Sequence, residues 1–119
     1  MDIKELLGKT LTQIEISEDK REIKIVTSEG ENYRQYHDQD CCESVYVEDV
    51  IGDLNDLIWQ PLTMAEESTN SKDNPKEAYE ERWTWTFYKL ATIKGYVTIR
   101  WYGCSNGYYS ESVYFEKVN

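Results

Sequence analysis

Apolar and polar residues alternate along much of the chain, which is the pattern of β-strands with one buried face. In the amino-terminal third, three such segments are separated by polar turns at 18–21 and 28–31. This spacing predicts a three-stranded antiparallel meander that begins near Thr10 and ends near His37. Asp2 and Asp53 each precede a short apolar stretch. This pattern predicts two short helical segments, each with one of these aspartates as its cap.

The rest of the chain adds further strand patterns and one polar interruption. Strands are predicted over 44–50, 82–92, 95–103 and 112–118, with a weaker candidate over 62–66. Residues 67–81 show no apolar periodicity, so we expect a mobile excursion there. We therefore predict one α+β domain over residues 1–119. It is mainly an antiparallel β-sheet of about six to seven strands with one or two short helices.

Composition and charge exclude several classes of function. The chain has 119 residues, with 23 acidic and 13 basic side chains and a net charge of −10. Since polymeric nucleic acid and anionic membranes both require a basic surface, neither is predicted as a partner. The amino terminus lacks the apolar core of a secretory signal, and the odd number of cysteines, 3, favours reduced thiols over a disulfide scaffold. We therefore expect a cytoplasmic protein.

The carboxyl-terminal third differs from the rest in charge and in aromatic content. Residues 82–119 contain five basic and two acidic side chains, whereas the preceding residues contain eight basic and twenty-one acidic ones. If Lys94 and Gly95 form the turn of a hairpin, Lys89 lies opposite Arg100 and Phe87 lies opposite Tyr102 on one face. The other face is the better core, and it carries Tyr88, Leu90, Val97, Ile99 and Trp101.

Two opposed cations beside aromatic rings predict a nucleotide site on the first of these faces. Rings stack on a base, and arginine offers paired donors to phosphate. Asn106 and Tyr108, in the loop that follows, are expected to contact ribose hydroxyls. The alternative is that the two cations pair with nearby acids and the rings belong to the core. The candidate ligand-binding residues are Arg34, His37, Phe87, Lys89, Thr98, Arg100, Tyr102, Asn106 and Tyr108.

A second cluster of chemically active residues lies over 37–43, where the single histidine His37 precedes the adjacent Cys41 and Cys42. Zinc sites usually space their cysteines by two or more residues, so no metal is predicted. The sequence indicates no catalytic residues and no cofactor. A small metal or thiol hydrolase centred on His37 and Cys41 remains an alternative. An acidic protein that inhibits a host DNA-binding enzyme by charge mimicry is another.

Four stretches of the sequence resemble a small domain of bacteriophages and Gram-positive bacteria that is associated with the Thoeris anti-defence sponge proteins. These stretches are 37–45, 85–88, 95–103 and 105–110. The resemblance implies a non-catalytic homo-oligomer in the host cytosol. Such a sponge would sequester a cyclic ADP-ribose-type immune signal, for example a glycocyclic ADP-ribose, during phage infection. Related sponges also capture cyclic oligonucleotides at a separate site, and the resemblance extends this second ligand class to the present chain.

Overall fold

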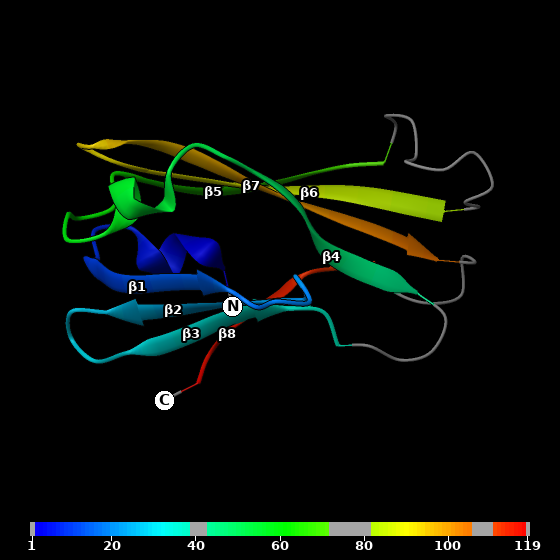
Figure 1. The fold of residues 1–119 in the computed structure, drawn as a ribbon, viewed down its shortest axis with the longest axis horizontal. Helices are drawn as coiled ribbons and strands as arrows, with labels where there is room; N and C mark the ends of the chain where they lie inside the picture. Colours follow the sequence, from blue (N-terminus) through cyan, green and yellow to red (C-terminus); the bar gives the residue numbers. More distant parts are fainter. Residues whose placement is uncertain (1, 39–42, 72–81, 106–110, 119) are drawn as a thin grey trace.

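Two four-stranded antiparallel sheets make up the chain (Figure 1). The structure is a computed structural model, and it describes residues 2–38, 43–71, 82–105 and 111–118. The strand order is β1-β2-β3-β8 in the first sheet and β4-β7-β6-β5 in the second. The strands are β1 (Leu11–Ile16), β2 (Glu22–Thr27), β3 (Asn32–Tyr36), β4 (Ser44–Ile51), β5 (Met64–Asn70), β6 (Arg82–Thr92), β7 (Gly95–Ser105) and β8 (Tyr114–Lys117).

The hydrophobic core lies between the two sheets. Alternate residues of each strand point inward, so Ile23 and Ile25 of the first sheet join Leu90 and Ile99 of the second in one buried cluster. Trp101, the largest fully buried side chain, belongs to the same cluster. This packing leaves each sheet with one outer face, and these two faces lie on opposite sides of the molecule.

The two predicted helical segments are single 3-10 turns, Ile3–Leu6 and Leu54–Leu57. Asp2 and Asp53 cap them as predicted, since each carboxylate accepts a hydrogen bond from the backbone amide two residues later. No α-helix occurs among the described residues, so the α+β class overstates the helical content. Neither of these two turns, the helical segments of the described residues, is long and apolar enough to cross a bilayer. The predicted single, mainly antiparallel domain is confirmed.

The predicted boundary of the polar excursion is wrong at its start, because β5 continues to Asn70. Only Ala65 of this edge strand is buried, and Glu66 to Thr69 are exposed. Backbone pairing with β6 holds the strand in place without any apolar alternation. Residues 72–81 lie outside the described residues. With β5 included, the described part of the chain has eight strands, against the six to seven predicted.

The predicted register of the β6–β7 hairpin is also wrong. Thr92 pairs with Gly95, so Ile93 and Lys94 form the turn, and Lys89 faces Thr98 rather than Arg100. Gly95 lies close to Asp56, because a Cβ there would lie 2.7 Å from a carboxylate oxygen of Asp56 and would force that side chain to move. The pairing slides by two positions along the strand, an even number, so each side chain keeps its predicted face. The predicted core face is therefore confirmed, since all its members are fully buried: Tyr88, Leu90, Val97, Ile99 and Trp101.

Candidate functional site

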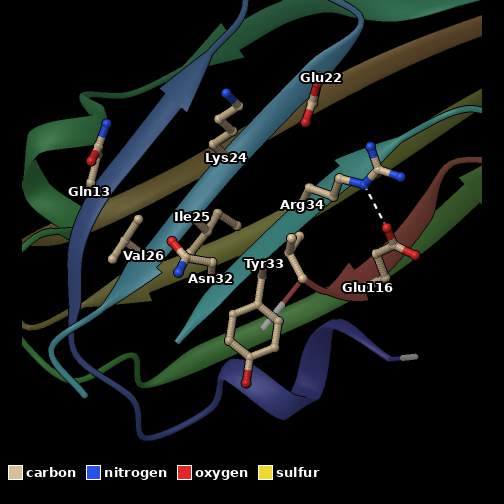
Figure 2. A pocket seen from close by; sticks show the side chains of 10 residues that line it. Gln13, Glu22, Lys24, Ile25, Val26, Asn32, Tyr33, Arg34 and Glu116 are labelled. Atoms are coloured by element: carbon tan, nitrogen blue, oxygen red, sulfur yellow. Dashed lines mark hydrogen bonds and ion pairs between the residues drawn. The ribbon is translucent and has the colours of Figure 1, made fainter. Parts of the chain in front are cut away.

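The outer face of the first sheet is hollowed into a groove of about 640 Å³ (Figure 2). This volume lies within the range of small-molecule sites in proteins, roughly 300–1,000 Å³. We call it the Arg34 groove. It is lined by Gln13, Glu22, Lys24, Ile25, Val26, Asn32, Tyr33, Arg34, Glu116 and Val118. The lining residues come from all four strands of this sheet, which lie side by side in the order β1-β2-β3-β8.

Two cations face each other inside this groove. The β2–β3 register places Lys24 directly opposite Arg34. Like charges in this position destabilise a sheet, so their presence calls for neutralisation by carboxylates or by a bound anion. Glu15 lies opposite Lys24 on β1, and Glu116 lies opposite Arg34 on β8. The result is a row of four charged side chains across the sheet, with the two cations in the middle.

Arg34 is held by an aromatic ring and a carboxylate. Its guanidinium lies 3.9 Å from the centroid of the Tyr36 ring, and its Nε donates to Oε1 of Glu116 at 2.6 Å. The hydrogen bond to Glu116 is the main reason that the pKa of Arg34 is raised above its usual value. Figure 2 shows the two terminal nitrogens of Arg34 pointing away from Glu116. The arginine is therefore oriented by both groups, and its side chain stays 37% exposed.

Lys24 is exposed, and no described carboxylate or ring holds it in this way. The Glu15 carboxylate opposite it accepts a hydrogen bond from the Gln13 side chain at 2.9 Å. Across the described ranges of the chain, no ion pair includes Lys24. Lys24 therefore supplies a positive charge that no described carboxylate pairs with. An anionic group placed between Lys24 and Arg34 would meet both cations.

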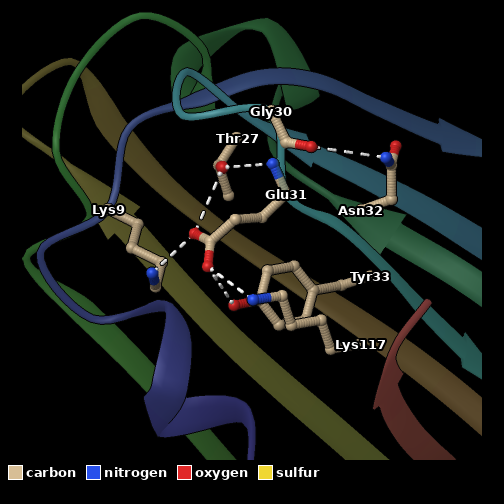
Figure 3. A network of polar contacts seen from close by, with 7 residues as sticks. All are labelled: Lys9, Thr27, Gly30, Glu31, Asn32, Tyr33 and Lys117. Carbon is tan, nitrogen blue, oxygen red and sulfur yellow. Dashed lines mark hydrogen bonds and ion pairs between the residues drawn. The ribbon is translucent and has the colours of Figure 1, made fainter. Parts of the chain in front are cut away.

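The wall formed by β8 is tied to the rest of the first sheet through Glu31 (Figure 3). Its carboxylate accepts from Lys9 at 2.6 Å and from Lys117 of β8 at 3.1 Å. Thr27 also donates to it at 3.3 Å. The hydrogen bonds from the two lysines lower the pKa of Glu31 to about 2. We call this group the Glu31 clasp, because it joins the amino-terminal segment, the β2–β3 turn and the last strand.

The face singled out from the sequence is the outer face of the second sheet, which we call the hairpin face. The structure brings these predicted residues together there: Phe87, Lys89, Thr98, Arg100 and Tyr102. Arg100 donates from Nε to Glu48 at 2.6 Å, and its Nη2 lies 3.6 Å from Asp49. Both carboxylates reach it because β4 has a β-bulge between Val47 and Asp49. The charge of Arg100 is thus met by two acids of the protein itself.

The rings of the hairpin face pack on one another. Tyr102 is fully buried although it points away from the main core. Its ring centroid lies 4.4 Å from that of Trp85 and 6.2 Å from that of Tyr46. The Arg100 guanidinium lies 5.2 Å from the Trp85 ring. These rings form a second apolar cluster on the outer side of the sheet. For Arg100 and Tyr102 this is close to the alternative considered from the sequence, in which the cations pair with nearby acids and the rings belong to the core.

The remaining predicted site residues are placed elsewhere. Arg34 lies in the groove on the opposite side of the molecule. The His37 side chain is only 3% exposed, with Nδ1 at 2.7 Å from the carbonyl oxygen of Ser112 and Nε2 at 3.9 Å from Glu43. Its ring also stacks on Tyr114. Asn106, Tyr108 and Cys41 lie outside the described residues.

Sequence reasoning missed Lys24, although a signal for it was present. The register of β2 and β3 follows from the turn at 28–30, where Gly30 adopts a φ of +83° and Val26 pairs with Asn32. Counting back from that turn would have placed Lys24 opposite Arg34. The same counting was applied only to the carboxyl-terminal hairpin, because that region is richer in aromatic residues.

The described residues bring no three or more His, Cys, Asp or Glu side chains together as a potential metal site. Comparison with curated proteins finds no match, and comparison with solved structures finds none either. A family model described as "Domain of unknown function (DUF7448)" matches residues 4–115. This description names no ligand, activity or partner, so the link to the Thoeris sponges stays a prediction. Because the match covers most of its length, the chain belongs to the DUF7448 family.

Proposed function

We propose that this chain is a non-catalytic module that captures a cyclic ADP-ribose-type nucleotide in the Arg34 groove. The observation that carries the proposal is the direct opposition of Lys24 and Arg34 inside a groove of about 640 Å³. A pyrophosphate between these cations would relieve the part of their mutual repulsion that the Arg34–Glu116 ion pair does not neutralise. Binding and neutralisation would thus favour each other.

The groove also offers contacts for the rest of such a ligand. The amide side chains of Gln13 and Asn32 can both donate and accept, which suits a base edge or a hydroxyl. Val26 and Val118 provide an apolar surface for a ribose or a base. The groove therefore combines phosphate, polar and apolar contacts, which a nucleotide requires together. Sequestration of the signal would follow from binding alone, with no chemical step.

The overall negative charge does not oppose this function at short range. Although the net charge is −10, the Debye length at physiological ionic strength is about 8 Å, so distant acids are largely screened. The charges within the groove then decide the local potential. The lining holds two cations, Lys24 and Arg34, and two carboxylates, Glu22 and Glu116, so the groove itself carries none of the excess negative charge of the chain.

The hairpin face remains a rival location for the same ligand, because it holds most of the residues predicted from the sequence. Two features make it the weaker choice. Arg100 is already bound by Glu48 and Asp49, and the Tyr102 ring is buried. A stacking surface there would require Tyr102 to leave its neighbours.

Calorimetric titration with cyclic ADP-ribose tests the proposal and separates the two faces. We expect the double variant Lys24→Ala/Arg34→Ala to bind at least about tenfold more weakly than the unmodified chain, since each lost charged hydrogen bond contributes about 1.5–3 kcal/mol. The matched variant Lys89→Ala/Arg100→Ala should bind like the unmodified chain. If only the hairpin variant loses affinity, the site lies on the hairpin face, and if the unmodified chain does not bind, the proposed function is wrong.

A sponge must also release its ligand unchanged. We expect cyclic ADP-ribose to be recovered intact after heat denaturation of the complex, and recovery of a hydrolysed product would show an enzyme instead. Native mass spectrometry of protein taken from cells that produce the immune signal would report the retained nucleotide and the number of subunits together. The same experiment tests the proposed homo-oligomer and the proposed role in phage anti-defence.

A further inference from the structure

Glu22 is a negative side chain in a groove that we have assigned to an anionic ligand. It lies on β2, two residues before Lys24, and its side chain lines the groove (Figure 2). Glu22 is half-buried, and its backbone amide donates to Ser17 Oγ at 3.1 Å. In the described part of the chain, no ion pair includes its carboxylate. A purely anionic ligand would be repelled by this residue, so the ligand must offer something more.

A smaller hollow of about 90 Å³ adjoins the groove and shares two residues with it. It is lined by Glu15, Ser17, Glu22 and Lys24. Glu22 and Lys24 thus stand at the boundary between the two depressions. Successive side chains on one face of a strand are about 7 Å apart, so one ligand can contact both residues at the same time. The ligand would place its phosphate at Lys24 and another group in the hollow.

Apart from Lys24, which is assigned to the phosphate, the other polar side chains of the hollow already have partners. The Ser17 hydroxyl donates to Asp19 at 2.6 Å and accepts from the backbone amide of Glu22. Glu15 accepts from Gln13 at 2.9 Å. Glu22 is therefore the side chain best placed to receive a new hydrogen bond. A carboxylate only accepts, so the group that occupies the hollow must donate.

We propose that Glu22 accepts a hydrogen bond from a ribose hydroxyl and makes the groove selective for ribonucleotides over their deoxy counterparts. This inference rests on the proposed function. Adjacent sugar hydroxyls are donors that sit within a few ångströms of a nucleotide phosphate, and acidic side chains read them in other nucleotide-binding proteins. The Lys24 and Glu22 pair then recognises a phosphate and a sugar hydroxyl together. Inorganic pyrophosphate, which has no sugar hydroxyl, satisfies only the phosphate half of the site.

The test uses calorimetric titration to compare cyclic ADP-ribose with an analogue that lacks the 2′-hydroxyl on each of its two riboses. The unmodified chain should bind the analogue about tenfold or more weakly, which is the effect of losing one hydrogen bond to a charged group. In Glu22→Gln, which keeps a neutral acceptor, the difference between the two ligands should shrink, and in Glu22→Ser, which has a shorter side chain, it should fall below about threefold. Inorganic pyrophosphate should bind these variants at least as tightly as the unmodified chain, because a negative charge has been removed.

Glu66→Gln is the matched control, since Glu66 is an exposed acid on the outer side of the second sheet, opposite Lys89. It should keep the full preference for the ribonucleotide. The role of Glu22 is overturned if the unmodified chain binds both ligands equally, or if both Glu22 variants keep the preference. In those cases the proposed function stands, because cyclic ADP-ribose still binds. If the unmodified chain binds no cyclic ADP-ribose, both proposals fall.

Discussion

The two outer faces of this molecule carry the same local arrangement with different results. On each face an arginine lies near an aromatic ring and bonds a carboxylate from a neighbouring strand, as Arg34 does with Glu116 and Arg100 does with Glu48. What differs is the residue directly across the strand pair. Arg34 faces Lys24, whereas Arg100 faces Phe87. Among the described residues, no ion pair includes Lys89 of the hairpin face either, so what the register decides is that two cations lie directly opposite each other on the groove face.

The size of the surrounding side chains strengthens the contrast. The row beside Arg34 consists of Gln13, Val26 and Asn32, which are small or flexible, and the sheet is hollow there. The row beside Arg100 contains Tyr102 between Tyr46 and Trp85, and these rings fill the space. We therefore interpret the groove as a binding surface and the hairpin face as mainly a packing surface.

The largest effect should come from removing a ring of the hairpin face. Tyr102→Ala deletes a fully buried aromatic side chain and should lower the free energy of unfolding by roughly 3–5 kcal/mol. Tyr36 is half-buried on the outer face of the first sheet, so Tyr36→Ala should lower the free energy of unfolding by less than half of that amount. Urea unfolding of both variants measures the difference. Equal small losses would contradict the packing role of the hairpin face.

Substitution of the arginines should also lower the free energy of unfolding more on the hairpin face than in the Arg34 groove, but with a smaller difference. Arg100→Gln breaks ion pairs to two carboxylates, and its side chain is 30% exposed, so we expect a loss of about 1–2 kcal/mol in the free energy of unfolding. Arg34→Gln removes a more exposed pair, with side chains 37% and 43% exposed, and should cost under about 1 kcal/mol. Chemical denaturation measures both. A larger loss for Arg34→Gln would reverse the assignment of structural and binding roles.

The Glu31 clasp should make the first sheet sensitive to acid. The pKa of Glu31 is lowered to about 2 from its usual 4.5, so the stability that the clasp contributes is fully present above about pH 4.5 and is lost as the pH falls toward 2. Glu31→Gln should remove this part of the acid dependence and lower stability at neutral pH. Urea midpoints from pH 7 to pH 2 measure it for both proteins. Parallel profiles for Glu31→Gln and the unmodified chain would refute the clasp.

The smallest effect concerns the acid that competes for Arg34. Glu116→Gln keeps a hydrogen-bond acceptor beside Nε but removes its negative charge. We expect pyrophosphate to bind about two- to fivefold more tightly to this variant, since a nearby charge on a solvent-exposed face contributes under about 1 kcal/mol. Calorimetry measures the change. Weaker binding would mean that Glu116 orients Arg34 through its charge, and the groove would then need both residues ionised.

The sequence was sufficient for the features that depend on alternation. It predicted the buried face of the long hairpin, because Tyr88, Leu90 and Trp101 leave no other good core. It missed most of β5, whose residues are held by backbone pairing and of which Glu66 to Thr69 are exposed. Register was the main failure, since it depends on turn geometry that single residue types do not specify. The cation pair was expected at Lys89 and Arg100, and the structure has it at Lys24 and Arg34.

The position of β8 in the chain has a consequence for when the groove exists. This strand contributes Glu116 and pairs with β3, yet it follows every strand of the second sheet in the sequence. During synthesis on the ribosome, β1 to β3 emerge long before the strand that completes their sheet. A nascent chain that stops short of β8 has Lys24 and Arg34 but neither the Glu116 contact nor the Lys117 contact to Glu31. The wall of the groove thus forms only after nearly the whole domain has been translated.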